Sequence, residues 1–157
     1  MKTKWKAYAF WIALSEAVGA LSGLLTREGT RLYASAVEKP PLSPPGIVFP
    51  IVWTVLFALM GIGAARVYMS PPGRDRTRGL VLFGAQLAVN FFWSLIFFNL
   101  QAYAFAFFWL VLLWVLILAM LRVFSRVDRP AGRLQIPYLL WVTFAGYLNV
   151  GVWMLNK

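Results

Sequence analysis

The sequence contains no cysteine and no histidine in its 157 residues. Without cysteine there are no disulfide bonds, and without either residue the usual Cys/His zinc sites are excluded. The two absences also exclude a cysteine nucleophile, a serine nucleophile activated by histidine, and histidine as an axial ligand of haem iron. We therefore predict no metal site and no cofactor, and conventional hydrolytic or metal-dependent chemistry is not expected.

Acidic residues are scarce, since the chain has five of them against fifteen lysines and arginines. Only Glu16 lies within a long apolar stretch, so a mechanism that needs two paired carboxylates lacks its second partner. Two interpretations of Glu16 stay open. It is either a proton or ligand contact inside a membrane domain, or a neutral, hydrogen-bonded carboxyl group near a helix interface.

Hydrophobic residues, by contrast, make up 61% of the chain. The longest stretch without a charged residue or a proline covers 43 residues, from 79 to 121. A single helix of that length would measure about 64 Å, whereas the hydrocarbon core of a bilayer is about 30 Å thick. The stretch must therefore reverse, and the polar cluster of Asn99, Gln101 and Tyr103 is where a turn can reach the water interface.

Three further apolar stretches bring the number of predicted membrane crossings to five. The predicted spans are residues 6–25, 46–68, 79–98, 103–124 and 134–155. Because these spans take up most of the chain, there is no room for a separate soluble domain. We expect an all-α fold, one integral membrane bundle of five transmembrane helices over residues 1–157.

The formal net charge of +10 raises the alternative of a nucleic-acid partner, and the placement of the basic residues argues against it. Eleven basic residues lie at one set of span ends: Lys2, Lys4, Lys6, Arg66, Arg74, Arg76, Arg78, Arg122, Arg126, Arg129 and Arg133. Four lie on the opposite side: Arg27, Arg31, Lys39 and Lys157. The positive-inside rule then predicts a cytoplasmic N-terminus in an inner membrane, as in a multi-pass protein of the bacterial cell envelope.

The connection between the first two spans, residues 26–45, is longer than a helix hairpin needs, and we expect it to act as a lid. Its first half can form a short helix. Residues 39–46 include four prolines, so this segment cannot be helical and is expected to run as stiff polyproline II. Arg27, Arg31 and Lys39 lie near the expected mouth, where they can pair with carboxylates of a ligand.

Polar and aromatic residues recur at helical spacing in the second, third and fifth spans. Amides such as Gln86, Asn90 and Asn149 are costly in contact with lipid, so they should face the bundle interior. They would bring Trp93 and Trp141 inward with them. The sequence thus predicts an interior lined with tryptophan.

Small residues form two ridges on the predicted helices. In the first span Ser15, Gly19 and Gly23 favour close packing of another helix, with room for a ligand as the alternative. In the third span Gly84 and Ala88 favour a homodimer through that span.

Four segments of the chain carry short motifs: YASAVEKP at 33–40 followed by PP at 44–45, VW at 52–53, QLAVN at 86–90 with Trp93, and PYLLW at 137–141 with LN at 148–149. Together these motifs resemble the TspO/MBR family. This family comprises the tryptophan-rich sensory proteins of bacteria and the translocator, or peripheral benzodiazepine receptor, proteins of mitochondria. The motifs occur in the family's order on four segments and extend over nearly the whole chain.

The resemblance implies a five-helix bundle, often a homodimer, with a ligand pocket closed by the first loop. It implies protoporphyrin IX and related tetrapyrroles, sterols, and benzodiazepine-type compounds as ligands. By position, Trp53 and Trp141 match two tryptophans used for ligand contact and for light-dependent porphyrin breakdown, the only candidate catalytic residues. The sterol-recognition pattern of animal members needs a basic residue soon after a tyrosine, and Tyr147 has none before Lys157. Porphyrin is therefore a stronger expectation than sterol.

The aromatic stripes and the resemblance together predict one ligand-binding set. Its members are Tyr33, Trp53, Phe57, Gln86, Asn90, Trp93, Tyr138, Trp141, Ala145 and Asn149. Indole faces stack on flat π-systems, which suits a porphyrin or another flat apolar molecule. We expect a membrane receptor, sensor or carrier for tetrapyrroles. The alternatives are an enzyme that degrades bound porphyrin in light and a passive transporter of porphyrin or membrane lipid.

Overall fold

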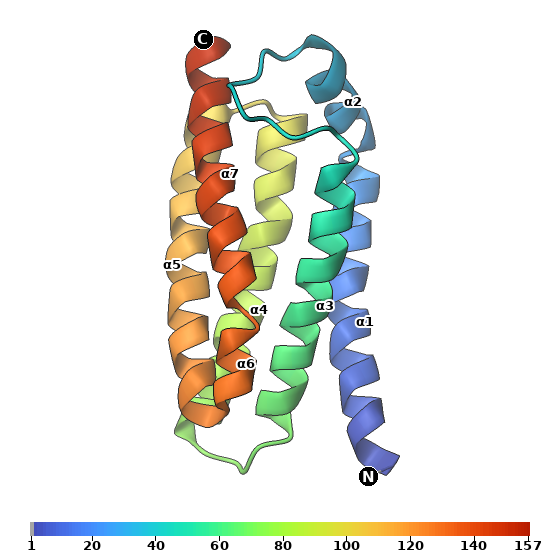
Figure 1. The fold of residues 1–157 in the computed structure, drawn as a ribbon, viewed down its shortest axis with the longest axis vertical. Helices are drawn as coiled ribbons and strands as arrows, with labels where there is room; N and C mark the ends of the chain where they lie inside the picture. Colours follow the sequence, from blue (N-terminus) through green and yellow to red (C-terminus); the bar gives the residue numbers. More distant parts are fainter. Residues whose placement is uncertain (1) are drawn as a thin grey trace.

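The computed structural model describes residues 2–157, and every regular element within them is a helix. The elements are α1 (Lys2–Leu25), α2 (Arg27–Ala36), α3 (Val48–Tyr68), α4 (Arg74–Ser94), the π-helical turn η1 (Leu95–Asn99), α5 (Tyr103–Val127), α6 (Arg129–Arg133) and α7 (Ile136–Leu155). Five helical segments are long and apolar enough to cross a membrane, which confirms the predicted bundle. Figure 1 shows the five long helices side by side, with the N-terminus at one end and the C-terminus at the other.

The bounds of the helices differ by a few residues from those of the predicted spans, most clearly in α4 and α5. Helix α4 begins at Arg74, before the predicted start at residue 79, and α5 continues to Val127, past the predicted end at 124. Hydropathy marks where lipid contact ends, but a helix satisfies its own backbone hydrogen bonds in water as well and continues beyond the apolar core. The turn between α5 and α6 comes at Asp128, whose carboxylate accepts a hydrogen bond from the Ala131 backbone N–H at 3.1 Å.

The predicted reversal within residues 79–121 occurs at the expected polar cluster. Helix α4 widens into η1, the Leu100 N–H bonds the Leu95 carbonyl at 3.0 Å, and Gln101 adopts a left-handed φ of 53° before α5 begins. The Asn99 side chain then donates to the carbonyl oxygen of Leu25 at 2.9 Å. This bond holds the ends of α1 and η1 at the same level of the bundle.

The half of the bundle remote from the lid is closely packed. A methyl group at Gly61 of α3 would lie 2.5 Å from Ile12 Cα, so the backbones of α1 and α3 touch there. Beyond this contact Arg66 Nε donates to Asp128 Oδ2 at 2.6 Å, which joins α3 to the α5–α6 turn. Open space is therefore left to the half near the lid.

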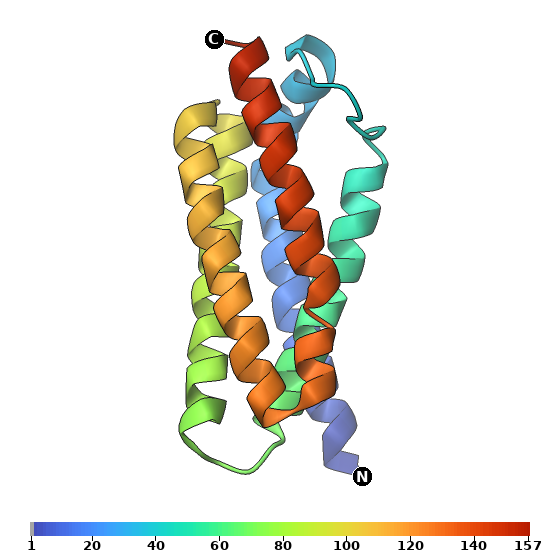
Figure 2. The same cartoon turned by 60° about the vertical axis from the view of Figure 1, so that its left-hand side comes forward.

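The lid, residues 26–45, starts with the predicted short helix, α2, and continues without helix. Figures 1 and 2 show it crossing the end of the bundle that carries the C-terminus. The expectation of uniform polyproline II is wrong at Leu42, which has a φ of 71°. A turn forms there because the Ser43 hydroxyl donates to the Pro40 carbonyl at 2.7 Å.

Candidate functional site

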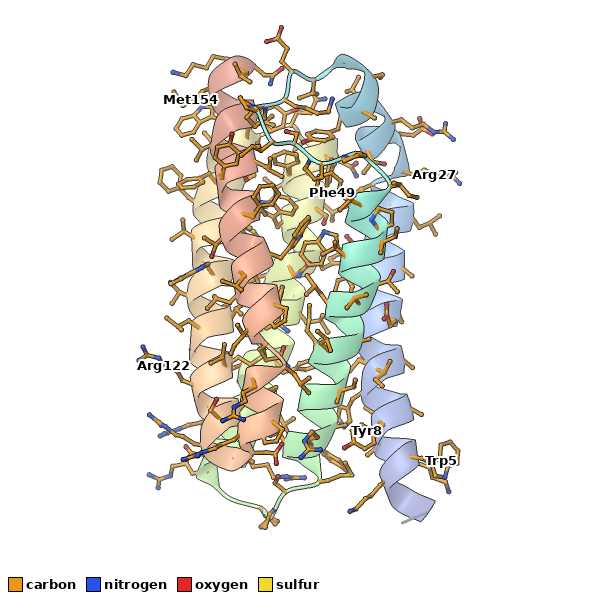
Figure 3. The ribbon with its side chains drawn as sticks, viewed as in Figure 1. Trp5, Tyr8, Arg27, Phe49, Arg122 and Met154 are labelled. Atoms are coloured by element: carbon orange, nitrogen blue, oxygen red, sulfur yellow. The ribbon has the colours of Figure 1, made fainter. Side chains whose placement is uncertain are left out.

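A cavity of about 650 Å³ lies beneath the lid, between the upper halves of α1, α3, α4 and α7. Residues of α1 from Glu16 to Gly23, with Thr26 just after the helix, line one wall, and residues of α3 from Phe49 to Phe57 line another. The residues of α4 and η1 from Asn90 to Phe98 and those of α7 from Trp141 to Asn149 form the other walls, and lid residues such as Tyr33 and Lys39 cover the cavity. Figure 3 places Phe49 close to the lid segment, far from Arg122 and Tyr8 at the packed end.

Most of the predicted ligand-binding residues come together on this cavity. Those that line it are Tyr33, Trp53, Phe57, Asn90, Trp93, Trp141, Ala145 and Asn149. Two do not: Gln86 and Tyr138 are fully buried outside the lining. Helical periodicity placed them correctly on the inward face, but it cannot tell a side chain that reaches the cavity from one a turn further from the lid. A role in ligand binding stays a prediction for the eight that line the cavity.

The buried residues Gln86 and Tyr138 form a hydrogen-bond network with Asn90, which lines the cavity. Tyr138 donates its hydroxyl proton to Gln86 Oε1 at 2.6 Å and accepts a hydrogen bond from Asn90 Nδ2 at 2.7 Å. Gln86 Nε2 in turn contacts Met60 Sδ at 3.7 Å. This network joins α3, α4 and α7, and it fixes the amide of Asn90 at the floor of the cavity.

A second network holds Trp93. Its indole N–H donates to Asn149 Oδ1 at 3.2 Å, and Asn149 Nδ2 donates to the Tyr103 carbonyl at 2.8 Å. The Trp93 ring stacks on Phe97 with centroids 5.0 Å apart and planes at 24°. Trp93 is thus a rigid wall residue whose polar atom is already bonded.

Trp53 and Trp141 differ from Trp93, because their indole N–H groups make no hydrogen bond within residues 4–157. Both are half-buried on the cavity lining. Trp53 packs on Phe57 with ring centroids 5.6 Å apart, and Trp141 meets Phe49 edge-on at 5.9 Å. Each therefore presents an aromatic surface and an unused donor to the region of the cavity.

The three predicted carboxylate-pairing residues occupy different places. Lys39 lines the cavity, with its Nζ 5.0 Å above the Tyr33 ring and bonded to the carbonyls of Ala34 and Val37. Arg27 and Arg31 do not line it, because the outer face of α2 turns them to solvent, and Arg31 pairs with Glu28 at 3.2 Å. Burial, with a smaller contribution from the nearby Tyr103, raises the pKa of the Tyr33 phenol, so it stays neutral beneath Lys39.

Three side-chain hydrogen bonds tie the lid to α7. Asn156 accepts from the Glu38 backbone N–H at 3.0 Å and donates to the Glu38 carbonyl at 2.7 Å. The hydroxyl of Tyr147 donates to the Pro41 carbonyl at 2.6 Å. Pro40 is buried against Gly151, where a methyl group would lie 2.5 Å from Pro40 Cβ.

The wall formed by α1 was only partly anticipated. Of the small-residue ridge, Ser15 packs on α3, and its hydroxyl donates to the Phe57 carbonyl at 2.8 Å. Gly19 touches the Phe57 ring, whereas Gly23 has no atom within 4 Å of an added methyl group and opens on the cavity. Close packing therefore holds for Ser15 and Gly19, and room for a ligand beside Gly23 stays a prediction. Glu16 also lines the cavity, and its helical spacing with Gly19 and Gly23 was the signal for it.

Comparisons with known proteins agree with this architecture. The sequence profile of the TspO/MBR family matches residues 11–154. The tryptophan-rich protein TspO of Chlorobaculum tepidum is 39% identical over 149 residues, which are 94% of each chain. The protein CrtK of Rhodobacter capsulatus is 41% identical over 79% of this chain and 78% of its own length. The translocator protein of Bos taurus is 32% identical over 100% of this chain and 94% of its own length. The chain is a multi-pass membrane protein and belongs to the TspO/MBR family.

Proposed function

We propose that this protein is a membrane receptor, sensor or carrier that binds a flat tetrapyrrole such as protoporphyrin IX in the cavity beneath the lid. The observation that carries the proposal is the pair Trp53 and Trp141, which line one cavity from α3 and α7 with unused indole N–H groups. The cavity volume lies in the range of small-molecule sites, about 300–1,000 Å³. Its other walls are largely apolar and aromatic, as binding of a flat ring system requires.

The names of related proteins support a sensing or carrying role. Relatives are called tryptophan-rich sensory protein in Cereibacter sphaeroides and translocator protein in Bos taurus. Lys39 at the lid supplies a positive charge for a carboxylate on the edge of the ligand. Charge placement further supports a cytoplasmic N-terminus in a bacterial inner membrane, with the lid facing the opposite compartment.

Titration with protoporphyrin IX tests the proposal through intrinsic tryptophan fluorescence in lipid nanodiscs. We expect saturable quenching by the unmodified protein and about tenfold weaker binding by Trp53→Phe/Trp141→Phe, because two stacking surfaces are reduced. Trp5→Phe is the matched control, since Trp5 is exposed at the opposite end of the bundle and should leave affinity unchanged. Absence of saturable quenching, or equal affinity in the double variant, would remove the proposed site.

The same complexes separate binding from light-dependent porphyrin breakdown by dioxygen, the second candidate function. It is favoured by the contact of the cavity-lining Trp53 with the buried Tyr138, whose ring centroids are 6.2 Å apart. Porphyrin absorbance is followed in light and in darkness. If porphyrin absorbance decays faster in light and this decay requires Trp53 and Trp141, the result supports an enzyme. If the unmodified protein and the double variant give equal decay, the result supports a receptor without this activity.

A further inference from the structure

Glu16 is the only acidic residue, and Lys39 the only basic one, among the residues found on the cavity lining. Glu16 lies within the membrane-spanning part of α1, where an ionisable group is costly unless it meets a partner. No side chain of residues 4–157 forms a salt bridge or a hydrogen bond with it. The other acids of the chain lie in the lid or at the packed end. The carboxyl group of Glu16 is thus an unused acceptor at the cavity.

The depth of Glu16 follows from helix geometry. Asn99 donates to the Leu25 carbonyl at 2.9 Å, so the ends of α1 and η1 lie at one level. Glu16 is nine residues before Leu25, and Asn90 is nine residues before Asn99. At about 1.5 Å per residue, both therefore lie about 13 Å below that level. Two polar side chains from different helices consequently reach the cavity at the same depth.

Asn90 also presents an acceptor there. The single hydroxyl proton of Tyr138 goes to Gln86 Oε1, so Tyr138 can only accept from Asn90, and Nδ2 of Asn90 must be the atom that faces it. Asn90 Oδ1 has no partner among residues 4–157. Within the described chain only Gln135 Oε1 is both enclosed and unpaired, so Asn90 Oδ1 reaches open space. The network thereby turns the amide oxygen, not the amide nitrogen, toward the cavity.

We propose that Glu16 and Asn90 form a subsite for a ligand nitrogen that carries hydrogen, either a protonated amine or an N–H group. The inference rests on the proposed function, and it adds the orientation of the ligand in the cavity. A carboxylate lies near Lys39 at the lid, and the nitrogen lies deeper, near two acceptors on different helices. The ligand class is an amphoteric aromatic molecule, and a carboxylate-bearing tetrapyrrole with pyrrole nitrogens is one example. A charged nitrogen also compensates the carboxylate of Glu16 within the membrane-spanning part of α1.

Binding of 9-aminoacridine and of acridine tests the subsite in nanodiscs of zwitterionic lipid. Above neutral pH the first is a flat cation and the second is a neutral molecule of nearly the same shape. Fluorescence anisotropy of each probe is measured with unmodified protein, Glu16→Gln and Glu16→Asp. Glu28→Gln is the matched control, because Glu28 is exposed on the lid and pairs with Arg31.

We expect Glu16→Gln to weaken binding of 9-aminoacridine about tenfold while acridine binds as before, since only the charge-assisted hydrogen bond is lost. Glu16→Asp and Glu28→Gln should retain the affinity for the cation. Unchanged binding of acridine also shows that the variant is folded. Equal affinity of the unmodified protein and Glu16→Gln for 9-aminoacridine would overturn the inference.

The result is independent of the porphyrin titration. If protoporphyrin IX binds through Trp53 and Trp141 but Glu16→Gln does not alter 9-aminoacridine binding, the subsite is wrong and the receptor stands. If protoporphyrin IX fails to bind while the cation binds through Glu16, the tetrapyrrole is wrong as the ligand, and the subsite stands as part of a cavity for another aromatic molecule.

Discussion

At the scale of the residue, a glycine has opposite roles in different parts of this bundle. Gly61 has no Cβ because the backbone of α1 occupies that space, with Ile12 Cα 2.5 Å from the position of an added methyl group. Gly84 on α4 is exposed and has no atom within 4 Å of that position. The sequence alone does not separate the two, because both sit inside apolar helices with small neighbours.

We therefore expect Gly61→Ala and Gly84→Ala to change stability in opposite directions. Gly61→Ala forces α1 away from α3 and should lower the free energy of unfolding by about 1–3 kcal/mol. Gly84→Ala adds helix propensity without a clash inside the protomer and should be neutral or raise this free energy by up to about 1 kcal/mol. Thermal unfolding in detergent, followed by circular dichroism, measures both. Equal destabilisation of the two variants would show that α1 and α3 are not in backbone contact.

At the scale of the element, hydrogen bonds from α7 and from Asn156 just after it hold the segment that follows α2 over the cavity. Tyr147 is next to the cavity residue Leu148, and Asn156 is about two turns beyond Asn149, but neither Tyr147 nor Asn156 lines the cavity. They bond the lid backbone at Glu38 and Pro41. We expect a ligand that leaves past the lid to break these hydrogen bonds. They should therefore affect the rate of ligand dissociation more than the dissociation constant.

The double variant Asn156→Ala/Tyr147→Phe tests this lid closure. We expect about tenfold faster dissociation of protoporphyrin IX, because three hydrogen bonds to the lid are removed, with a smaller change in the dissociation constant. Stopped-flow displacement measures the rate. Arg31→Gln serves as the control, since it breaks only the exposed pair with Glu28 on the outer face of α2. An unaltered rate in the double variant would mean that ligand does not pass the lid.

At the scale of the whole molecule, the outer surface of α4 suits a second copy of the chain. Val81, Gly84, Ala88 and Phe92 are exposed on this helix, and the small pair lets another helix come close. The cavity lies on the other side of α4, where Asn90 and Trp93 face inward. We propose a homodimer through this surface, which leaves both cavities open to ligand.

Replacement of Gly84 by tryptophan should therefore convert a dimer to a monomer. Light scattering in detergent gives the mass of the protein after correction for bound detergent. Val115→Trp is the control, because Val115 is exposed on α5 and away from the α4 surface. The proposal fails if the unmodified protein is a monomer, or if both variants stay dimeric.

Prediction from sequence succeeded for the features that follow from contact with lipid, which constrains each residue of a span in the same way. The five spans and the reversal near Gln101 followed from the length of uncharged stretches, because backbone groups in a bilayer must bond within a helix. The inward faces of α4 and α7 followed from buried amides. It did not place Arg27 and Arg31, which lie outside the cavity lining, since the orientation of α2 depends on how the lid packs on η1 and α7.

The sequence by itself determined that this chain is a helical membrane bundle, because hydrophobic length and charge placement act locally along each span. It also determined which helix faces avoid lipid. Only the tertiary structure decided that the cavity lies in the half of the bundle near the lid, on the lid side of the contact between Gly61 and Ile12. It likewise decided that Tyr138 accepts a hydrogen bond from Asn90, and that Glu16 lines the cavity without a hydrogen-bond partner among residues 4–157. Such features depend on distances between helices, and spacing along one helix does not encode them.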